Sequence, residues 1–206
     1  MPSRNRSNAH WIRRHVTDPY VKRSIAEGYR SRAAYKLIEI DDKDRLLRPG
    51  LVVIDLGAAP GSWSQVAAQR VTGRGRVIAL DLLPIESLPG VETVQGDFRE
   101  EAVEQQLLDL IGEARPDVVL SDMAPNLSGI AASDSARSLH LAELAMAFAV
   151  KYLQPDGAFL VKAFQGSGYS QYVRHLKSAF RAVATRKPAA SRETSAEVYL
   201  LARHLR

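Results

Sequence analysis

Four aspartates stand at corresponding places in the chain, each at or near the end of a run of mostly apolar residues. The runs are LVVIDLG (51–57), RVIALDLLP (76–84), VETVQGDF (91–98) and PDVVLSDMAP (116–125), and their acids are Asp55, Asp81, Asp97 and Asp122. A fifth run, GAFLVKAF (157–164), contains Lys162 instead. Like charges repel, so four acids gathered at one edge favour a positively charged ligand, unless each only caps the helix or turn that follows.

The loop after the first run, GAAPG (57–61), has glycines suited to a ligand-binding turn but neither common phosphate-binding pattern. It lacks the G-x-G-x-x-G of nicotinamide enzymes and the Gly-Lys-Ser/Thr end of a P-loop, and Asp55 would repel a pyrophosphate. Gly57 and Gly61 allow the backbone to approach a ligand closely. Asp81 follows Gly61 at the spacing where an acid commonly binds ribose hydroxyls. These features suit S-adenosylmethionine, which has an adenosine, a sulfonium cation and an amino-acid tail.

The elements that would position these residues alternate along the chain. Helices are predicted at 31–43, 62–71, 100–112, 138–153 and 169–180, and two last strands at 182–187 and 196–203. Buried strands joined by helices indicate a parallel sheet covered on both faces, with ligands at the carboxyl ends of its strands. The last two strands have no helix between them and are expected to form an antiparallel edge hairpin. The predicted fold is α/β, with a Rossmann-like, mostly parallel seven-stranded sheet in a single domain of residues 1–206.

Composition excludes several classes of site and suggests a polyanionic partner. The 206 residues include no cysteine, so disulfides and thiolate metal sites are excluded. No apolar run approaches a membrane span, and a cytoplasmic location is expected. The net charge of +5 is uneven, because residues 1–36 hold nine bases and two acids, residues 171–206 hold eight and two, and the middle holds eleven and nineteen. Two basic ends indicate contact with a polyanion, although an uneven solvated surface gives the same counts.

The first 20 or so residues are polar and basic and are expected to form a flexible arm. Bases in this arm and just after it can contact phosphates with little sequence specificity. The candidates for RNA binding are Arg13, Arg14, Lys22, Arg23, Arg30 and Arg32. Trp11, Tyr20, Tyr29 and Tyr35 lie among them and either stack on bases or pack the arm onto the sheet, which is the stronger expectation for Tyr35.

Six segments together resemble the FtsJ/RrmJ family of ribosomal RNA 2′-O-ribose methyltransferases, over nearly the whole chain. They are WIRRHVTDPYVKRSIAEGYRSRAAYKLIEI, DLGAAPGSWSQVA, GDF, LSDMAPNLSG, FLVKAFQG and SAEVYLLAR. The resemblance implies an S-adenosylmethionine-dependent methyltransferase fold and methylation of a uridine ribose in the A loop of 23S ribosomal RNA, on the assembled large subunit. A monomer that needs no metal and no membrane is expected. The implied cofactor contacts are Asp55, Gly57, Gly61, Trp63, Asp81, Asp97 and Asp122; a buried core position is the alternative for Trp63.

The family is marked by a Lys-Asp-Lys-Glu tetrad, which falls here on Lys36, Asp122, Lys162 and Glu197. Glu197 is preferred to the nearby Glu193 because EVYL follows the family pattern. Lys162 is the expected proton acceptor for the ribose hydroxyl, and its pKa of ~10.4 would have to be lowered, as a second cation at Lys36 would do. In another version both lysines stay charged and only orient the hydroxyl and its developing charge. Sequence does not separate the two.

Three alternative functions follow from the same residues. The first keeps the chemistry but changes the substrate to transfer RNA or a messenger RNA cap. The second is a non-catalytic RNA-binding protein of the same fold, which an intact tetrad disfavours. The third is a nicotinamide-dependent oxidoreductase, which the acidic DLGAAPG loop disfavours.

Overall fold

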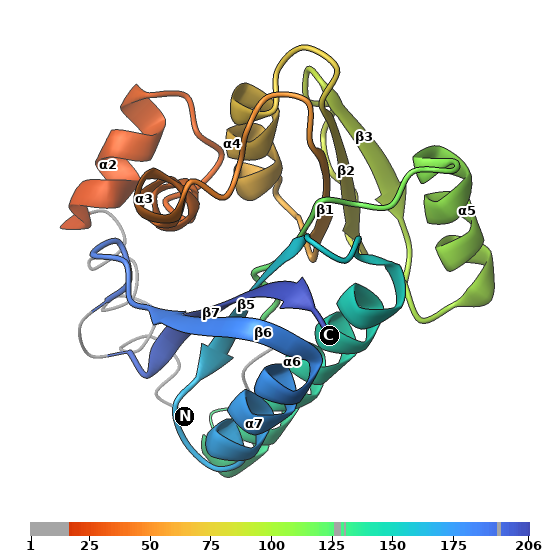
Figure 1. The fold of residues 1–206 in the computed structure, drawn as a ribbon. Helices are drawn as coiled ribbons and strands as arrows, with labels where there is room; N and C mark the ends of the chain where they lie inside the picture. The colour runs from red at the N-terminus through yellow and green to blue at the C-terminus, as the bar shows by residue number, and fades with distance from the viewer. Residues whose placement is uncertain (1–16, 126–128, 130, 193–194) are drawn as a thin grey trace, which may run out of the picture.

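A single sheet contains all seven strands of the part of the chain that the computed structural model describes, namely residues 17–125, 129, 131–192 and 195–206. The strand order is β3-β2-β1-β4-β5-β7-β6 (Figure 1). The strands are β1 (Val52–Leu56), β2 (Arg76–Asp81), β3 (Val91–Gln95), β4 (Val118–Ser121), β5 (Ala158–Phe164), β6 (Phe180–Arg186) and β7 (Glu197–Leu205). Strands β1 to β5 are parallel to one another, which confirms the predicted mostly parallel seven-stranded sheet.

The last two strands pair as an antiparallel hairpin, as expected, but the later strand lies inside the sheet. β7 is antiparallel to β5 on one side and to β6 on the other. It therefore brings Glu197 opposite Phe164 and Tyr199 opposite Lys162. β6 begins at Phe180, directly after the preceding helix ends, and forms the exposed edge of the sheet.

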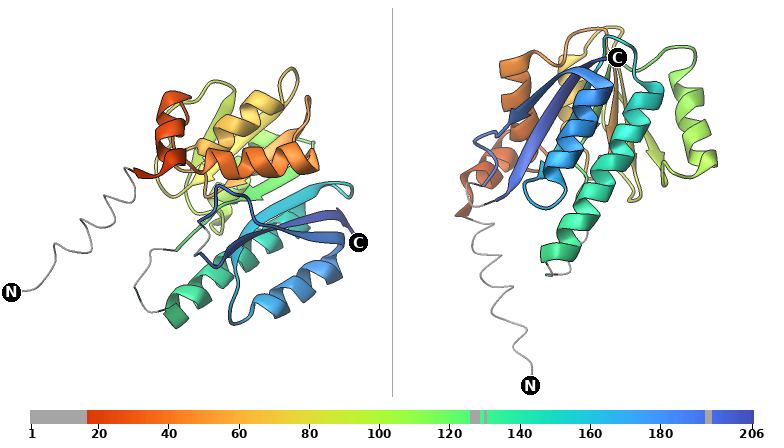
Figure 2. Two further views of the ribbon diagram at one scale, coloured as in Figure 1. Left: turned by 90° about the vertical axis from the view of Figure 1, so that its left-hand side faces the viewer. Right: turned by 60° about the horizontal axis from the view of Figure 1, so that its bottom comes forward.

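Helices cover both faces of the sheet (Figures 1 and 2). They are α2 (Pro19–Ala26), α3 (Ala34–Asp44), α4 (Ser62–Arg70), α5 (Glu101–Ile111), α6 (Ala131–Tyr152) and α7 (Tyr169–Ala179). One core cluster joins α3 and α4 to the sheet through residues such as Leu37 and Val66. The other joins α5, α6 and α7 through residues such as Leu107, Phe148 and Leu176. Each face is thus closed by apolar side chains, and the strand ends remain available for a site. None of the helices among the described residues is both long and apolar enough to traverse a lipid bilayer.

Two helices differ from the sequence prediction. α6 begins at Ala131 rather than at 138. α2 was not predicted, although the chain carries a signal for it: Asp18 caps the helix by accepting a hydrogen bond from the Tyr20 amide, and Pro19 stands at its first position. The basic arm expected before it, including Arg13, Arg14 and Trp11, lies outside the described residues.

Candidate active site at the carboxyl ends of the strands

The loop between β1 and α4 is held in place by the next strand. The amides of Gly57 and Ala58 both donate to the carbonyl oxygen of Leu80. Asp81, at the end of β2, accepts hydrogen bonds from the Ala59 amide at 2.8 Å and from the Leu83 amide at 2.8 Å. The Asp81 carboxylate thus fixes the loop, and its remaining lone pairs are still able to accept other donors.

The two glycines of this loop are required by backbone conformation and by packing. Gly57 has a φ of 74°, and a Cβ there would lie 2.2 Å from Cγ of Met123. Gly61 has a φ of 103°, and a Cβ would lie 2.8 Å from Cδ1 of Leu88 and 2.9 Å from a guanidinium nitrogen of Arg30. Positive φ favours glycine, and both positions are closed by neighbouring protein. Direct approach of these glycines to a ligand remains a prediction.

A hollow lies beside this loop and reaches the end of β4. It is lined by Ser31, Ala33, Asp55, Gly57, Ala58, Ala59, Pro60, Ser62, Trp63 and Asp122. Asp55 is only 1% exposed, and its Oδ2 accepts a 2.6 Å hydrogen bond from the Ser64 hydroxyl. Its Oδ1 is buried and has no hydrogen-bond partner among the described residues. Burial of this carboxyl, together with the negative charges of Asp122 and Asp81, raises the pKa of Asp55 to about 7, against the opposing hydrogen bond from Ser64.

The four tetrad residues form two ion pairs. Nζ of Lys36 lies 2.8 Å from Oε1 and 2.9 Å from Oε2 of Glu197, which also accepts a 2.8 Å hydrogen bond from Ser191. Nζ of Lys162 lies 3.1 Å from Oδ1 of Asp122 and donates to the Asp122 backbone carbonyl. The Lys162 side chain is only 7% exposed, so it is no surface lysine. Glu193, the alternative glutamate, lies outside the described residues.

Tyr199 joins the two ion pairs, although it is not among the site residues that the sequence predicts. Its hydroxyl donates to Oδ1 of Asp122 at 2.8 Å, and its ring centroid lies 5.6 Å from Nζ of Lys36. The residue is fully buried and faces Lys162 across the β5–β7 ladder. Burial first, and then the charges of Asp122 and Glu197, raise the pKa of Tyr199 well above its usual value, so it remains a neutral donor. The sequence signal was the alternation in EVYL, which places Glu197 and Tyr199 on the same face of a strand.

Trp63 belongs to both the core and the wall of the hollow. Its ring lies 5.5 Å from that of Tyr199, and its indole N–H donates to the Ala33 carbonyl at 2.9 Å. It is 2% exposed, as expected for a core residue. It also lines the hollow. Trp63 therefore links the helix that carries Lys36 to the loop that carries Gly61.

Asp97 stands apart from the hollow, in the turn that follows β3. Its two oxygens lie 2.9 Å from Nε of Arg99, and this guanidinium holds the pKa of Asp97 below its ordinary value. The contact of Asp97 with an adenine stays a prediction.

The candidate RNA-binding bases divide into two groups. Arg30 donates to the carbonyls of Pro60 at 2.7 Å and Ser87 at 3.0 Å, and Arg32 binds Asp18 and the Ala190 carbonyl. Both guanidinium groups thus brace the protein. Lys22 and Arg23 are exposed on α2, although Arg23 also pairs with Glu27.

The nearby tyrosines are committed to protein contacts. Tyr35 is 1% exposed, in agreement with the expectation that it packs the N-terminal region onto the protein. Its ring lies 5.5 Å from that of Tyr20 and 5.6 Å from that of Tyr29. Base stacking by Tyr20 and Tyr29 remains a prediction.

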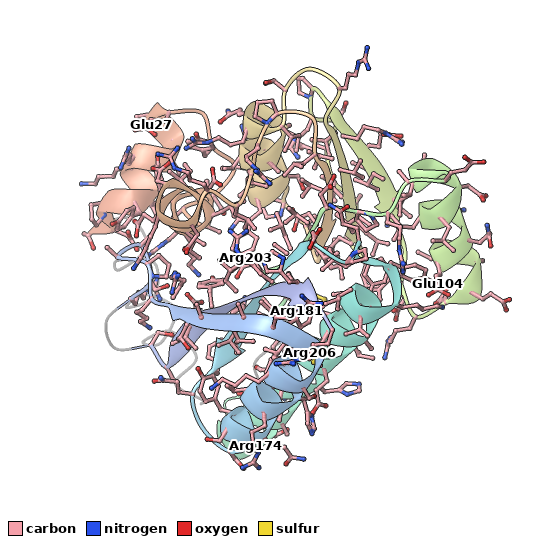
Figure 3. The ribbon with its side chains drawn as sticks, in the orientation of Figure 1. Glu27, Glu104, Arg174, Arg181, Arg203 and Arg206 are labelled. Atoms are coloured by element: carbon pink, nitrogen blue, oxygen red, sulfur yellow. The ribbon has the colours of Figure 1, made fainter. Side chains whose placement is uncertain are left out.

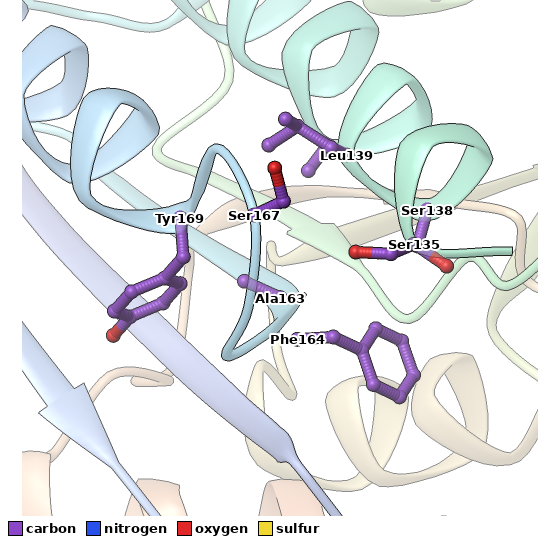
Figure 4. A pocket seen from close by; sticks show the side chains of 8 residues that line it. Ser135, Ser138, Leu139, Ala163, Phe164, Ser167 and Tyr169 are labelled. Atoms are coloured by element: carbon purple, nitrogen blue, oxygen red, sulfur yellow. The ribbon is translucent and has the colours of Figure 1, made fainter. Parts of the chain in front are cut away.

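A second, smaller hollow lies on the other face of β5. It is lined by Ser135, Ser138, Leu139, Ala142, Ala163, Phe164, Ser167 and Tyr169 (Figure 4). Because Ala163 and Lys162 alternate along the strand, this hollow opens toward α6 and α7 rather than toward the tetrad. Among the described residues, no three His, Cys, Asp or Glu side chains are grouped as metal ligands.

The fold and this site define a class of methyltransferase. Residues 29–205 match the family model of the FtsJ-like methyltransferases, and the chain belongs to this family. A relative from Azoarcus sp., named ribosomal RNA large subunit methyltransferase E, is 58% identical over 203 residues, which cover 98% of this chain and 99% of the relative. The protein of the same name from Thiobacillus denitrificans is 56% identical over 98% of this chain and 92% of that protein.

The solved structures agree with this assignment. A Plasmodium falciparum protein assigned as a ribosomal RNA methyltransferase matches with a TM-score of 0.77 and 31% identity, covering 86% of this chain and 98% of its own. The predicted family and the predicted methyltransferase activity are thereby confirmed.

Proposed function

We propose that this chain transfers a methyl group from S-adenosylmethionine to the ribose 2′-oxygen of a uridine in the A loop of 23S ribosomal RNA, on the assembled large subunit. We further propose that the whole chain is one methyltransferase domain that acts as a cytoplasmic monomer without a metal. The observation that carries the proposal is the meeting of the two lysine–carboxylate pairs through Tyr199, beside a hollow that Asp122 also lines.

The residues around the hollow fit S-adenosylmethionine. Asp55 and Asp122 both line the hollow, and the buried Oδ1 of Asp55 has no partner among the described residues. A ligand with positive charge would compensate both carboxylates. Asp81, at the end of the neighbouring strand β2, has lone pairs left for ribose hydroxyls. When bound, S-adenosylmethionine supplies an already activated methyl group, so alignment is the main task left to the protein.

The tetrad would receive the ribose. Asp122 orients Nζ of Lys162, and Glu197 orients Nζ of Lys36. We propose that Lys162 accepts the proton of the 2′-hydroxyl while Lys36 stabilises the negative charge that develops on that oxygen. Tyr199 donates to Asp122 and thereby fixes the position of that carboxylate between the hollow and Lys162.

Ribosomal RNA is favoured as the substrate by the names of the relatives. Two curated relatives, 58% and 56% identical to this chain, are named as ribosomal RNA methyltransferases, and the match covers nearly the whole length of each. A 2′-hydroxyl acceptor also requires RNA rather than DNA.

A direct test incubates the purified protein with S-adenosylmethionine labelled in its methyl group. The acceptors are large ribosomal subunits from cells that lack this protein, protein-free 23S ribosomal RNA, transfer RNA and capped messenger RNA. Nuclease digestion and mass spectrometry of the product should find one 2′-O-methyluridine, formed with large subunits as the best acceptor. Label in transfer RNA or caps alone, or on a base rather than a ribose, would contradict the proposal.

A further inference from the structure

We propose that the outer face of α7, continued by the start of β6, is a second docking surface for ribosomal RNA, separate from the site that holds the methylated nucleotide. This inference rests on the function proposed above. The surface, here called the α7 face, is formed by Arg174, Lys177 and Arg181.

The α7 face carries concentrated positive charge. No Asp or Glu occurs in the sequence between Asp156 and Glu193. Arg174, Lys177 and Arg181 are all exposed, and Figure 3 labels Arg174 along α7 and Arg181 just beyond its end. Among the described residues none of the three has an ion-pair partner, whereas some exposed bases elsewhere do, such as Arg70 with Asp42 and Lys151 with Glu104.

Other basic side chains of the same region of the chain make contacts within the protein. Arg186 is paired with Asp44, and Lys187 donates to the carbonyls of Ser195 and Glu197. Glu143 on α6 is an exposed acid close enough to the buried Tyr172 hydroxyl to raise its pKa, after the larger effect of burial, and no hydrogen bond or ion pair joins it to the three bases among the described residues. The exposed bases of the α7 face therefore remain available to a polyanion.

An RNA fits this face better than a membrane surface does. A helix that binds a bilayer presents its apolar side to the lipid, but the apolar side of α7 is buried against the sheet: Tyr172 is 1% and Leu176 is 0% exposed. What α7 presents to solvent is polar and basic. Contacts of this kind go to phosphates and provide affinity that depends on salt, without base specificity.

The position of the α7 face predicts the size of the substrate. α7 packs on the sheet face opposite α3, the helix that carries Lys36. α7 is 11 residues, or about 16 Å, long. It begins just after β5, and Arg181 follows its carboxyl end, at the start of β6. An RNA that places one nucleotide at the tetrad and also contacts the α7 face therefore extends from one face of the sheet to the other, as a folded RNA in a ribosomal subunit can.

The test compares two triple variants with matched loss of charge. One carries Arg174→Ala, Lys177→Ala and Arg181→Ala; the control carries Lys43→Ala, Arg48→Ala and Arg74→Ala, which are exposed bases near the amino ends of β1 and β2. The kcat and KM for methylation of large subunits are measured at several salt concentrations, with binding of S-adenosylmethionine as a check on folding. Binding to protein-free 23S ribosomal RNA is measured in parallel.

The KM of the α7 variant should be about tenfold higher than that of the wild type at low salt. The slope of log affinity against log salt concentration should become shallower, by the amount expected for the loss of about two or three phosphate contacts. The kcat of this variant and its affinity for S-adenosylmethionine should be unchanged, and the control should stay within about twofold of the wild type. Equal KM values for the two variants would overturn the proposal. A loss seen with subunits but not with protein-free RNA would assign the face to an acidic ribosomal protein and would also overturn it. Failure of the proposed function can be distinguished from failure of the α7-face proposal, because in the first case the wild type itself would methylate no ribosomal RNA.

Discussion

Replacing Asp55 by Asn tests whether the buried carboxyl is the group that recognises positive charge. The pKa of Asp55 is raised to about 7, from 3.8, chiefly by burial. A carboxyl whose pKa is raised on folding adds stability that is fully present below its unfolded pKa and is lost as the pH rises through its folded pKa. Between pH 5 and pH 8, the free energy of unfolding should therefore fall by about 3 kcal/mol because of this group.

Asp55→Asn should remove this fall without disturbing the fold, because the amide oxygen can still accept the hydrogen bond from the Ser64 hydroxyl. The assay is urea unfolding of the ligand-free protein at pH 5, 6, 7 and 8, for the wild type and the variant. Asp97→Asn is a matched control, since Arg99 lowers the pKa of Asp97 and its titration lies below this range. Parallel pH profiles for wild type and Asp55→Asn would refute the reasoning.

The same carboxyl should give ligand affinity the opposite pH dependence: as the pH rises, the stability of the wild type falls but its affinity for the methyl donor increases. A cationic methyl donor favours the ionised carboxylate, so the affinity of the wild type for S-adenosylmethionine should increase as the pH rises toward about 7. Below that pH the increase approaches about tenfold per unit. Asp55→Asn should bind more weakly at pH 8 and show a flat profile, as measured by titration calorimetry.

Three further substitutions test the framework of the site. Tyr199→Phe removes the hydroxyl that donates to Asp122 at 2.8 Å; unfolding free energy should fall by about 1–2 kcal/mol, and single-turnover methyl transfer should slow while donor affinity holds. Unchanged transfer would refute a positioning role for this hydroxyl. Arg30→Ala frees the loop that precedes α4 and should weaken S-adenosylmethionine binding in calorimetry; a defect confined to RNA binding would instead support its sequence-based assignment. Gly57→Ala sets a Cβ against Met123 at a φ of 74°, and thermal unfolding should report a loss of about 1–3 kcal/mol, whereas an unchanged melting temperature would contradict the packing argument.

The sequence was sufficient to predict the parallel strands because they alternate with helices along the chain, and the acids of the first four stand at or near their carboxyl ends. It was also sufficient to bring Lys36 and Glu197 together, but only through the family pattern, since they are far apart in the chain. The role of Tyr199 depends on register: it meets Asp122 only because β7 lies between β5 and β6. No local pattern fixes that placement, so the residue was missed.

The surface bases were harder to interpret, because an arginine in a basic segment has the same sequence signal whether it contacts phosphate or carbonyl oxygens. Arg30 and Arg32 bind carbonyls and an acid of distant segments. Lys22 has no such contact among the described residues and remains a candidate for RNA. Exposure and pairing, which only the structure supplies, separate these cases.

The role of Lys162 and its partners in directing a methyl group to a ribose oxygen can be measured in cells. Ribose methylation across 23S ribosomal RNA is mapped in cells that lack this protein and in cells that regain either the wild type or Lys162→Ala. In the cells without the protein a single A-loop uridine should lose its 2′-O-methyl group. The wild type should restore it, and Lys162→Ala, present at equal level and able to bind S-adenosylmethionine, should not. Restoration by Lys162→Ala, or an unaltered methylation map in the cells without the protein, would contradict this role.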